Sequence, residues 1–148
     1  MTSRRIAVRE AAIIALNTDR PSDVPEAGRR RYAPGMPLEQ SQIAVFFARE
    51  VTSPPTNRTF GVASRSLNLA VQCAVPVVNV EDADDAIEPL LNWAVKALAL
   101  STLGGLAVNI REETTDWSPV QADVVYMIAT ILFVVEYQTK RDDMEREA

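Results

Sequence analysis

Acidic residues are densest between positions 81 and 88, where their carboxylates could act as metal ligands or as acid-base groups. This acidic cluster consists of Glu81, Asp82, Asp84, Asp85 and Glu88. Carboxylate oxygens are preferred ligands of Ca²⁺ and Mg²⁺, but an EF-hand loop begun at Asp82 needs Gly and Glu where Ile87 and Trp93 stand. The cluster instead predicts the beginning of a helix, where side-chain oxygens cap free amides, and a weak cation site is the less favoured alternative.

Other catalytic residue types are scarce, because the 148-residue chain has no histidine and a single cysteine, Cys73. A Ser/His/Asp triad, a Cys/His pair, a His-ligated zinc site and a CxxC redox pair all need residues that this chain lacks. Chemistry by carboxylates, Lys, Tyr or bound Mg²⁺ remains open. No dense set of these residues singles out a reaction centre.

The net charge of −5 argues against a protein that coats nucleic acid by neutralising phosphates. Charge is nevertheless uneven along the chain. Residues 1–31 hold seven arginines against four acids, a balance of +3 that leaves −8 for the rest. The favoured interpretation of this basic end is a solvated helix face with a loop, and the alternative is a surface that binds a partner.

Compartment and domain number follow from length and hydropathy. The start of the chain has no continuous apolar segment of a signal peptide, and the longest apolar run, Val124 to Val135, is shorter than the ~20 residues that span a bilayer. We expect no secretion, a reduced Cys73 in the core and no use of the Asn57-Arg58-Thr59 sequon. We predict one domain over residues 1–138 and a charged tail over 139–148 that frays.

The first half of the chain predicts one helix followed by strands. Ser3 can cap a helix over about 3–17, and the Pro- and Gly-rich segment Pro21 to Pro37 predicts an extended connection with a short strand at 30–33. The apolar run 43–48 predicts a central strand, and residues 59–62 begin the strand that returns. A half-buried strand of about ten residues follows, because apolar residues alternate from Leu67 to Val75.

The second half predicts a helix and two strands. Apolar residues at helical spacing predict a helix over about 82–102, with Pro89 in its opening turn or bending it and Gly104-Gly105 as its stop. A short strand at 106–110, a polar loop at 112–119 and a final strand at about 123–138, apolar on both faces and covered on both, complete the chain. The fold class is therefore α+β, an antiparallel or mixed sheet of about four to five strands with two main helices on one face.

Trp93 and Leu100 lie seven residues apart on the flank of the apolar stripe of the second helix. They either widen the core face or form a strip that packs on another subunit, where Trp is often an anchor. The second interpretation predicts that Trp93→Ala weakens self-association more than folding. Arg58 and Arg65 flank Phe60 near an exposed loop, where a protein contact or a solvated loop is favoured over nucleic-acid binding.

The order of these elements, with Asp116-Trp117 in the polar loop and Phe133-Val134-Val135-Glu136-Tyr137 ending the last strand, resembles the tail-terminator proteins of long-tailed bacteriophages. These are also called minor tail or head-tail joining proteins. The resemblance covers Arg4 to Tyr137 and rests on element order, length and scattered residues.

The resemblance implies a structural virion protein with neither catalysis nor a cofactor. Its subunits close into a ring, typically of six, that caps the tail tube, stops tube polymerisation and contacts the neck or head-completion proteins. The ring assembles in the host cytoplasm, involves no membrane, and lets DNA pass through its lumen without specific binding.

Two candidate contact regions accompany this hypothesis. Trp93 and Leu100 are the candidate subunit interface, and the candidate tube or neck contact is the loop of Ser53, Pro54, Pro55, Thr56, Asn57 and Arg58. We also expect an acidic lumen, because negative charge repels DNA phosphates. The alternative function is a small α+β enzyme or ligand-binding dimer with a carboxylate or Tyr site between sheet and helices.

Overall fold

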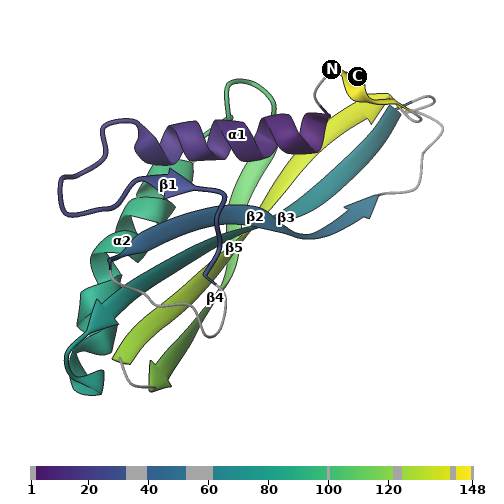
Figure 1. Ribbon diagram of the computed structural model, residues 1–148. Helices are drawn as coiled ribbons and strands as arrows, with labels where there is room; N and C mark the ends of the chain where they lie inside the picture. The colour runs from purple at the N-terminus through teal and green to yellow at the C-terminus, as the bar shows by residue number, and fades with distance from the viewer. Residues whose placement is uncertain are drawn as a thin grey trace.

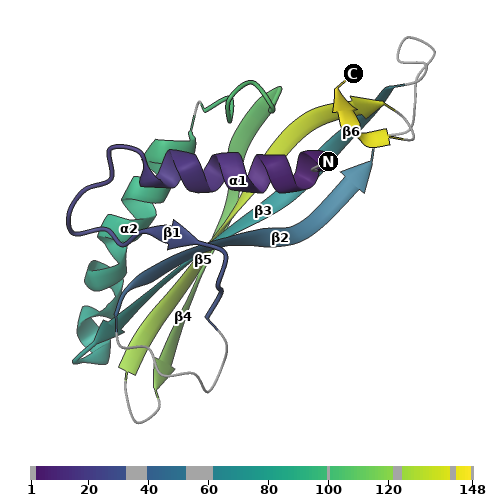
Figure 2. The ribbon, with the colours of Figure 1, turned by 45° about the horizontal axis from the view of Figure 1, so that its top comes forward.

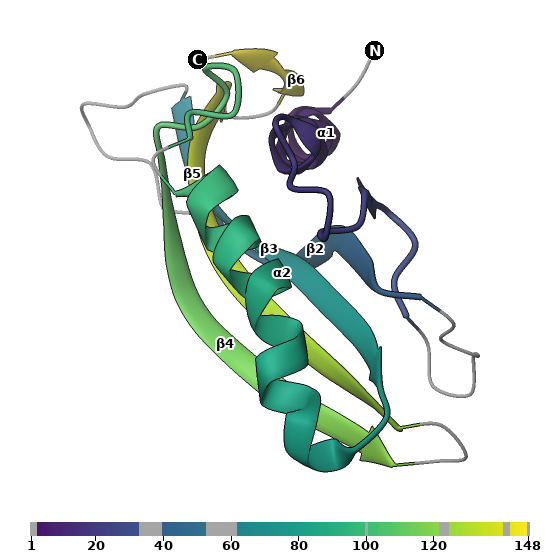
Figure 3. The same ribbon diagram turned by 90° about the vertical axis from the view of Figure 1, so that its left-hand side faces the viewer.

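A long twisted sheet carries both main helices on one of its faces, as the computed structural model shows (Figures 1 and 3). The structure describes residues 3–32, 40–52, 62–99, 101–121, 125–140 and 143–147. The elements are, in chain order, α1 (Arg4–Asn17), β1 (Ala27–Gly28), β2 (Gln42–Thr52), β3 (Val62–Val77), a 3-10 turn (Val80–Asp82), α2 (Ala83–Leu98), β4 (Asn109–Gln121), β5 (Val125–Lys140) and β6 (Asp143–Glu147).

The strands form a mixed sheet in the order β1-β2-β3-β5-β4, and β6 pairs with β5 outside this path. The short β1 runs parallel to β2, and every other pairing is antiparallel. At the centre, β3 and β5 pair without interruption from Val62 opposite Lys140 to Val77 opposite Val125. The predicted α+β class, with a mixed sheet and two main helices, is confirmed.

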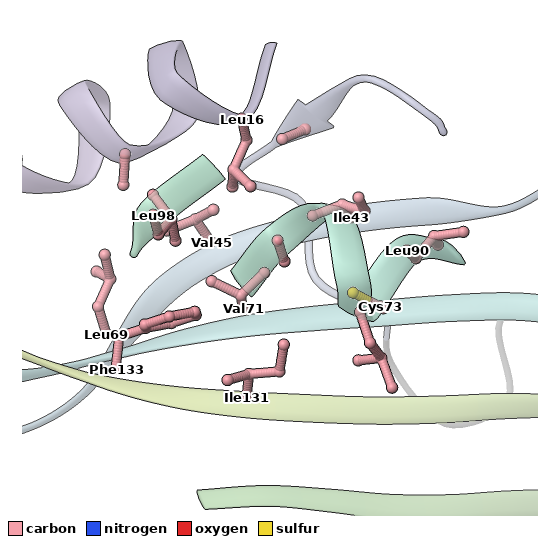
Figure 4. Close-up of a cluster of buried hydrophobic side chains, with 14 of the residues drawn as sticks. Leu16, Ile43, Val45, Leu69, Val71, Cys73, Leu90, Leu98, Ile131 and Phe133 are labelled. Carbon is pink, nitrogen blue, oxygen red and sulfur yellow. The ribbon is translucent and has the colours of Figure 1, made fainter. Parts of the chain in front are cut away.

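Alternation along β3 divides its residues between the two faces of the sheet. Leu67, Leu69, Val71, Cys73 and Val75 are all buried and pack under the helices (Figure 4). On β5, Ile131 and Phe133 share this covered face and are also fully buried, whereas Leu132 lies on the opposite, helix-free face and is half-buried. The final strand is therefore buried on one side and only partly covered on the other, which corrects the prediction of two covered faces.

The N-terminal helix forms as predicted. The Ser3 hydroxyl accepts a hydrogen bond from the Ile6 backbone N–H at 3.3 Å, which satisfies one of the free amides of the first turn. Val8, Ala12 and Leu16 recur every four residues and are the buried residues of α1. They place α1 over β2 and against α2 (Figure 2).

The second helix ends earlier than predicted, at Leu98 instead of residue 102. The chain then turns back so that Leu103, with φ of 51°, can be buried, and Gly104 and Gly105 follow with φ of 69° and 87°. The glycines therefore build the turn after the helix. Pro89 lies beyond the opening turn, at an exposed position where solvent can satisfy the carbonyl that lacks its donor.

Two predictions near the sheet edges were wrong. The short strand lies at Ala27–Gly28, which pair with Ile43 and Ala44, and residues 30–32 of the strand predicted at 30–33 belong to no strand. The strand predicted at 43–48 is part of β2, which lies between β1 and β3, although β1 covers its outer edge at Ile43 and Ala44 only. The region 112–119, predicted as a polar loop, belongs to β4, whose residues are mostly exposed because β4 ends the sheet.

The charged tail was expected to fray, but Asp143–Glu147 form β6, which pairs with the end of β5 and lies beside the beginning of α1 (Figure 2). Backbone pairing with β5 gives this segment a regular structure that its composition does not predict.

Candidate functional site

A bulge in β2 brings a carboxylate to the covered face of the sheet. The pairing of β2 with β3 shifts between Phe47 and Arg49, so that Glu50, opposite Leu67, faces the same side as Phe47. The extra residue reverses the alternation. Glu50 therefore points toward α1 and β5 instead of away from them.

Glu50 is the centre of a polar cluster formed by three other parts of the chain. One carboxylate oxygen accepts the Arg5 Nε–H at 2.7 Å and lies 3.5 Å from the Arg65 guanidinium, and the other oxygen accepts the Tyr137 hydroxyl. Arg65 also donates to Thr139 at 3.0 Å and to Thr52 at 3.2 Å. We call Arg5, Glu50, Arg65 and Tyr137 the Glu50 cluster.

The electrostatics of the Glu50 cluster stabilise one protonation state. Burial alone disfavours the Glu50 carboxylate, but hydrogen bonds from Arg5 and Tyr137, together with the charges of Arg5 and Arg65, lower its pKa below the usual value. Burial first, and then the hydrogen bond to Glu50, raise the pKa of Tyr137 well above its usual value. Near neutral pH, Glu50 is therefore charged and Tyr137 neutral. Because Arg5 belongs to α1 and Glu50 to β2, their hydrogen bond anchors α1 to the sheet.

A second polar contact lies on the helix-free face. The Tyr32 and Tyr126 hydroxyls are hydrogen-bonded, their ring centroids are 5.0 Å apart, and the Tyr32 N–H donates to Gln72 at 2.7 Å. Burial and the bond to Tyr126 raise the pKa of Tyr32 to about 12. This pair holds the segment after β1 against the helix-free face.

The arginines of the basic N-terminal region are placed differently from one another. Arg5 belongs to the Glu50 cluster, while Arg9 and Arg29 both contact Glu10, at 3.1 Å and 2.9 Å. Arg31 covers the Phe46 ring, 4.0 Å from its centroid. Arg30 is exposed, and no ion pair joins it to any described residue.

The acidic cluster lies at the 3-10 turn and the beginning of α2, as its sequence predicts, and its carboxylates are exposed. The predicted side-chain capping is not seen, because Asp82 precedes α2 without a side-chain cap hydrogen bond. Among the described residues, no three acidic or cysteine side chains come together as a metal site.

Trp93 of α2 is half-buried against the core, and its indole N–H donates to the Leu16 carbonyl at 2.8 Å. It therefore links the two helices within one chain, which agrees with the interpretation that Trp93 widens the core face of the second helix. Its contact with another subunit stays a prediction. Leu100 and the loop of Ser53 to Arg58 lie outside the described residues, as does Phe60.

Arg65, predicted in or beside an exposed loop, is instead internally paired on β3. Cys73 is a free, buried thiol on the covered face, and burial raises its pKa to about 12. Both residues therefore serve the interior of the fold.

A groove that the sequence did not predict runs between α2 and β4. Leu91, Val95 and Ile131 provide its apolar lining, and Trp117 of β4 stands beside it with 51% of its surface exposed. Glu88 and Glu112 add carboxylates from the two sides. In the sequence, the one sign of this groove is Trp117, because the pairing of β4 with β5 places this aromatic side chain on the covered face beside α2, where it stays half-exposed.

At one end of this groove, a hollow of about 370 Å³ is lined by Asp84, Glu88 and Trp117. Asp84 and Glu88 are one helical turn apart and so lie on the same side of α2. Lys96 also lines the groove but stands eight residues beyond Glu88, about 12 Å along the helix. The Trp117 end is therefore acidic.

No model of a known protein family and no curated protein matches this chain. In the part of the chain that the structure describes, no helix is long and apolar enough to cross a membrane.

Proposed function

We propose that this chain is a structural subunit of a ring that terminates the tail tube of a long-tailed bacteriophage and joins it to the neck. The observation that carries the proposal is the pair of unlike open edges on one sheet. At one end, β4 has no strand partner on its outer side among the described residues; at the other, β1 covers β2 at Ile43 and Ala44 only.

A closed ring needs two different surfaces on every subunit, because each copy contacts its neighbours head to tail. The opposite edges of this sheet provide such surfaces. The coarse order of helix, strands, helix and strands, which is part of the tail-terminator resemblance, is also the order of the fold, although Asp116 and Trp117 lie in β4 and not in a loop. Both features support a ring-forming role, and the ring would stop tube growth by covering the last layer of tube subunits.

The titratable side chains of the Glu50 cluster and of the tyrosine pair support a role without catalysis. Arg65 and Tyr137 are both bound to Glu50, and Tyr32 is bound to Tyr126. A carboxylate whose hydrogen-bond capacity is used inside the fold is a structural group, whereas a catalytic acid or base must reach a substrate.

The net charge of −5 suits a ring through which DNA slides. An acidic lumen repels phosphates, so the passing DNA is not held. The tail tube protein and the neck proteins are the expected partners on the two faces of the ring. A strongly positive lumen in the assembled ring would contradict this part of the proposal.

The proposal is tested with the full chain and with a tail tube protein that polymerises into tubes. Sedimentation and negative-stain images should show ring particles, alone or at the ends of tubes, and added protein should shorten the tubes that polymerise. A dimer that carries a bound small molecule and leaves tube length unchanged would instead support the enzyme or ligand-binding alternative.

A further inference from the structure

The two ends of the sheet carry opposite charge. Three consecutive arginines, Arg29, Arg30 and Arg31, follow β1 at the β2 end, and all three are exposed. The groove at the β4 end is lined by Glu88 and Glu112, and Asp84 adds a third carboxylate beside Trp117. Because β4 and β2 stand at opposite ends of the sheet (Figure 3), the groove beside β4 and the arginines that follow β1 lie far apart within one chain.

We propose that the Arg29–Arg31 segment of one copy of this chain docks into the α2–β4 groove of the next copy. The proposal rests on the proposed ring and names the two surfaces that meet in it. Its occupant is a second copy of the same chain because that copy supplies the complementary charge at the required place.

The chemistry of the groove suits a guanidinium. An arginine stacks on an exposed indole through a cation–π contact, and its fork of donors pairs with carboxylates. Trp117, Asp84 and Glu88 offer one aromatic face and two carboxylates around a single hollow. The apolar residues Leu91 and Ile131 can receive the methylene part of the side chain.

Arg30 is the arginine most available for this contact. Arg29 pairs with Glu10 at 2.9 Å and Arg31 is stacked on Phe46, whereas none of the described ion pairs uses Arg30. On the groove side, Glu88 stands one turn from Asp84, so two like charges lie close together on α2. An arginine from a neighbouring copy would offset both charges.

The test is a charge exchange in the full chain. Arg30→Glu and Glu88→Arg are each expected to weaken self-association about tenfold or more, as measured by sedimentation over a range of protein concentrations, because each places like charges in the contact. Neither substitution removes a hydrogen bond or ion pair within the described structure. Association of the unchanged protein should also weaken as salt is raised.

Mixing gives the sharper result. An equal mixture of the two variants should recover association, because alternating subunits pair Arg30 with Glu88 at one contact and the exchanged residues at the next. The double variant Arg30→Glu/Glu88→Arg should recover association by itself. Asp85→Arg is the matched control for Glu88→Arg, because it makes the same charge change on the same helix. Asp85 lines neither the groove nor the hollow at its end.

Failure of this inference is distinguishable from failure of the proposed function. If both single variants form rings as the unchanged chain does, or if the mixture fails to recover, these surfaces do not meet although rings form. If Asp85→Arg weakens association equally, net charge and not this contact is responsible. If the unchanged chain neither self-associates nor shortens tail tubes, the proposed function is itself contradicted, and the contact with it.

Discussion

The two faces of the sheet differ in what holds their side chains. On the covered face, Leu69 and Phe133 lie under α1 and α2 and are fully buried. On the helix-free face, the neighbouring Leu132 is half-buried, and Tyr32 with Tyr126 forms the main buried contact. The difference indicates that, among the described residues, folding free energy comes mainly from the covered face, while most residues of the β4 edge are exposed.

The largest expected effect separates two adjacent residues of β5. Phe133→Ala should lower the free energy of unfolding by about 3–5 kcal/mol, because it removes a fully buried ring and leaves a cavity. Leu132→Ala, on the helix-free face, should cost about 1 kcal/mol. Urea unfolding followed by circular dichroism measures both. Phe133→Leu provides a milder variant if the alanine variant does not fold, and equal losses at the two positions would abolish the distinction between the faces.

The Glu50 cluster gives the next largest effect. Glu50→Gln should cost about 2 kcal/mol, because it leaves the arginines and Tyr137 without the carboxylate to which they are bonded. Glu136→Gln is the matched control: Glu136 pairs with Arg111 at 2.9 Å, but both side chains are exposed, so its loss should cost less than about 1 kcal/mol. Unfolding free energies that rank the two substitutions the other way would show that the Glu50 cluster is not an anchor.

Lowering the pH should remove the stability that the Glu50 carboxylate contributes. Because the pKa of Glu50 is lower in the folded protein than its usual 4.5, the folded state binds this proton more weakly than the unfolded chain does. The stability from Glu50 is therefore complete above about pH 4.5 and is lost as the pH falls through the folded pKa. Unfolding measured from pH 7 to pH 2 should show the wild-type chain and Glu50→Gln converging in acid. A constant difference between them would contradict this assignment.

Sequence patterns predicted the elements in which burial is regular. Alternation from Leu67 to Val75 identified the covered face of β3, and the Ser3 cap located the beginning of α1, because both signals are local. The strand at 112–119 was missed for the opposite reason. A sheet-edge strand that is exposed on most of its length has no apolar alternation by which to recognise it.

The candidate surfaces were harder to predict, because they depend on contacts between distant parts of the chain. Glu50 reaches Arg5 and Tyr137 because the bulge in β2 moves its side chain to the covered face of the sheet. No local sequence pattern predicts that bulge. The sequence predicts Trp117 in a polar loop. Its place beside α2 depends on the pairing of β4 with β5, and a loop at 112–119 would not form that pairing.

The smallest expected effect on folding belongs to Trp117, and it is the most informative about function. Trp117→Ala should change the free energy of unfolding by about 1 kcal/mol or less, because half of the side chain is already in solvent. The same substitution should weaken self-association, since the indole forms one wall of the acidic hollow. Sedimentation and urea unfolding of one preparation measure the two effects together.

Trp93→Ala completes the comparison, because both tryptophans lie near α2 but serve different neighbours. Trp93 bonds to the Leu16 carbonyl and packs on the core, so its loss should cost about 2 kcal/mol of folding free energy. If Trp93→Ala instead weakens association more than folding, the helix flank is the subunit interface. If Trp117→Ala destabilises the fold and leaves association unchanged, the β4 edge is part of the core and the ring contact must lie elsewhere.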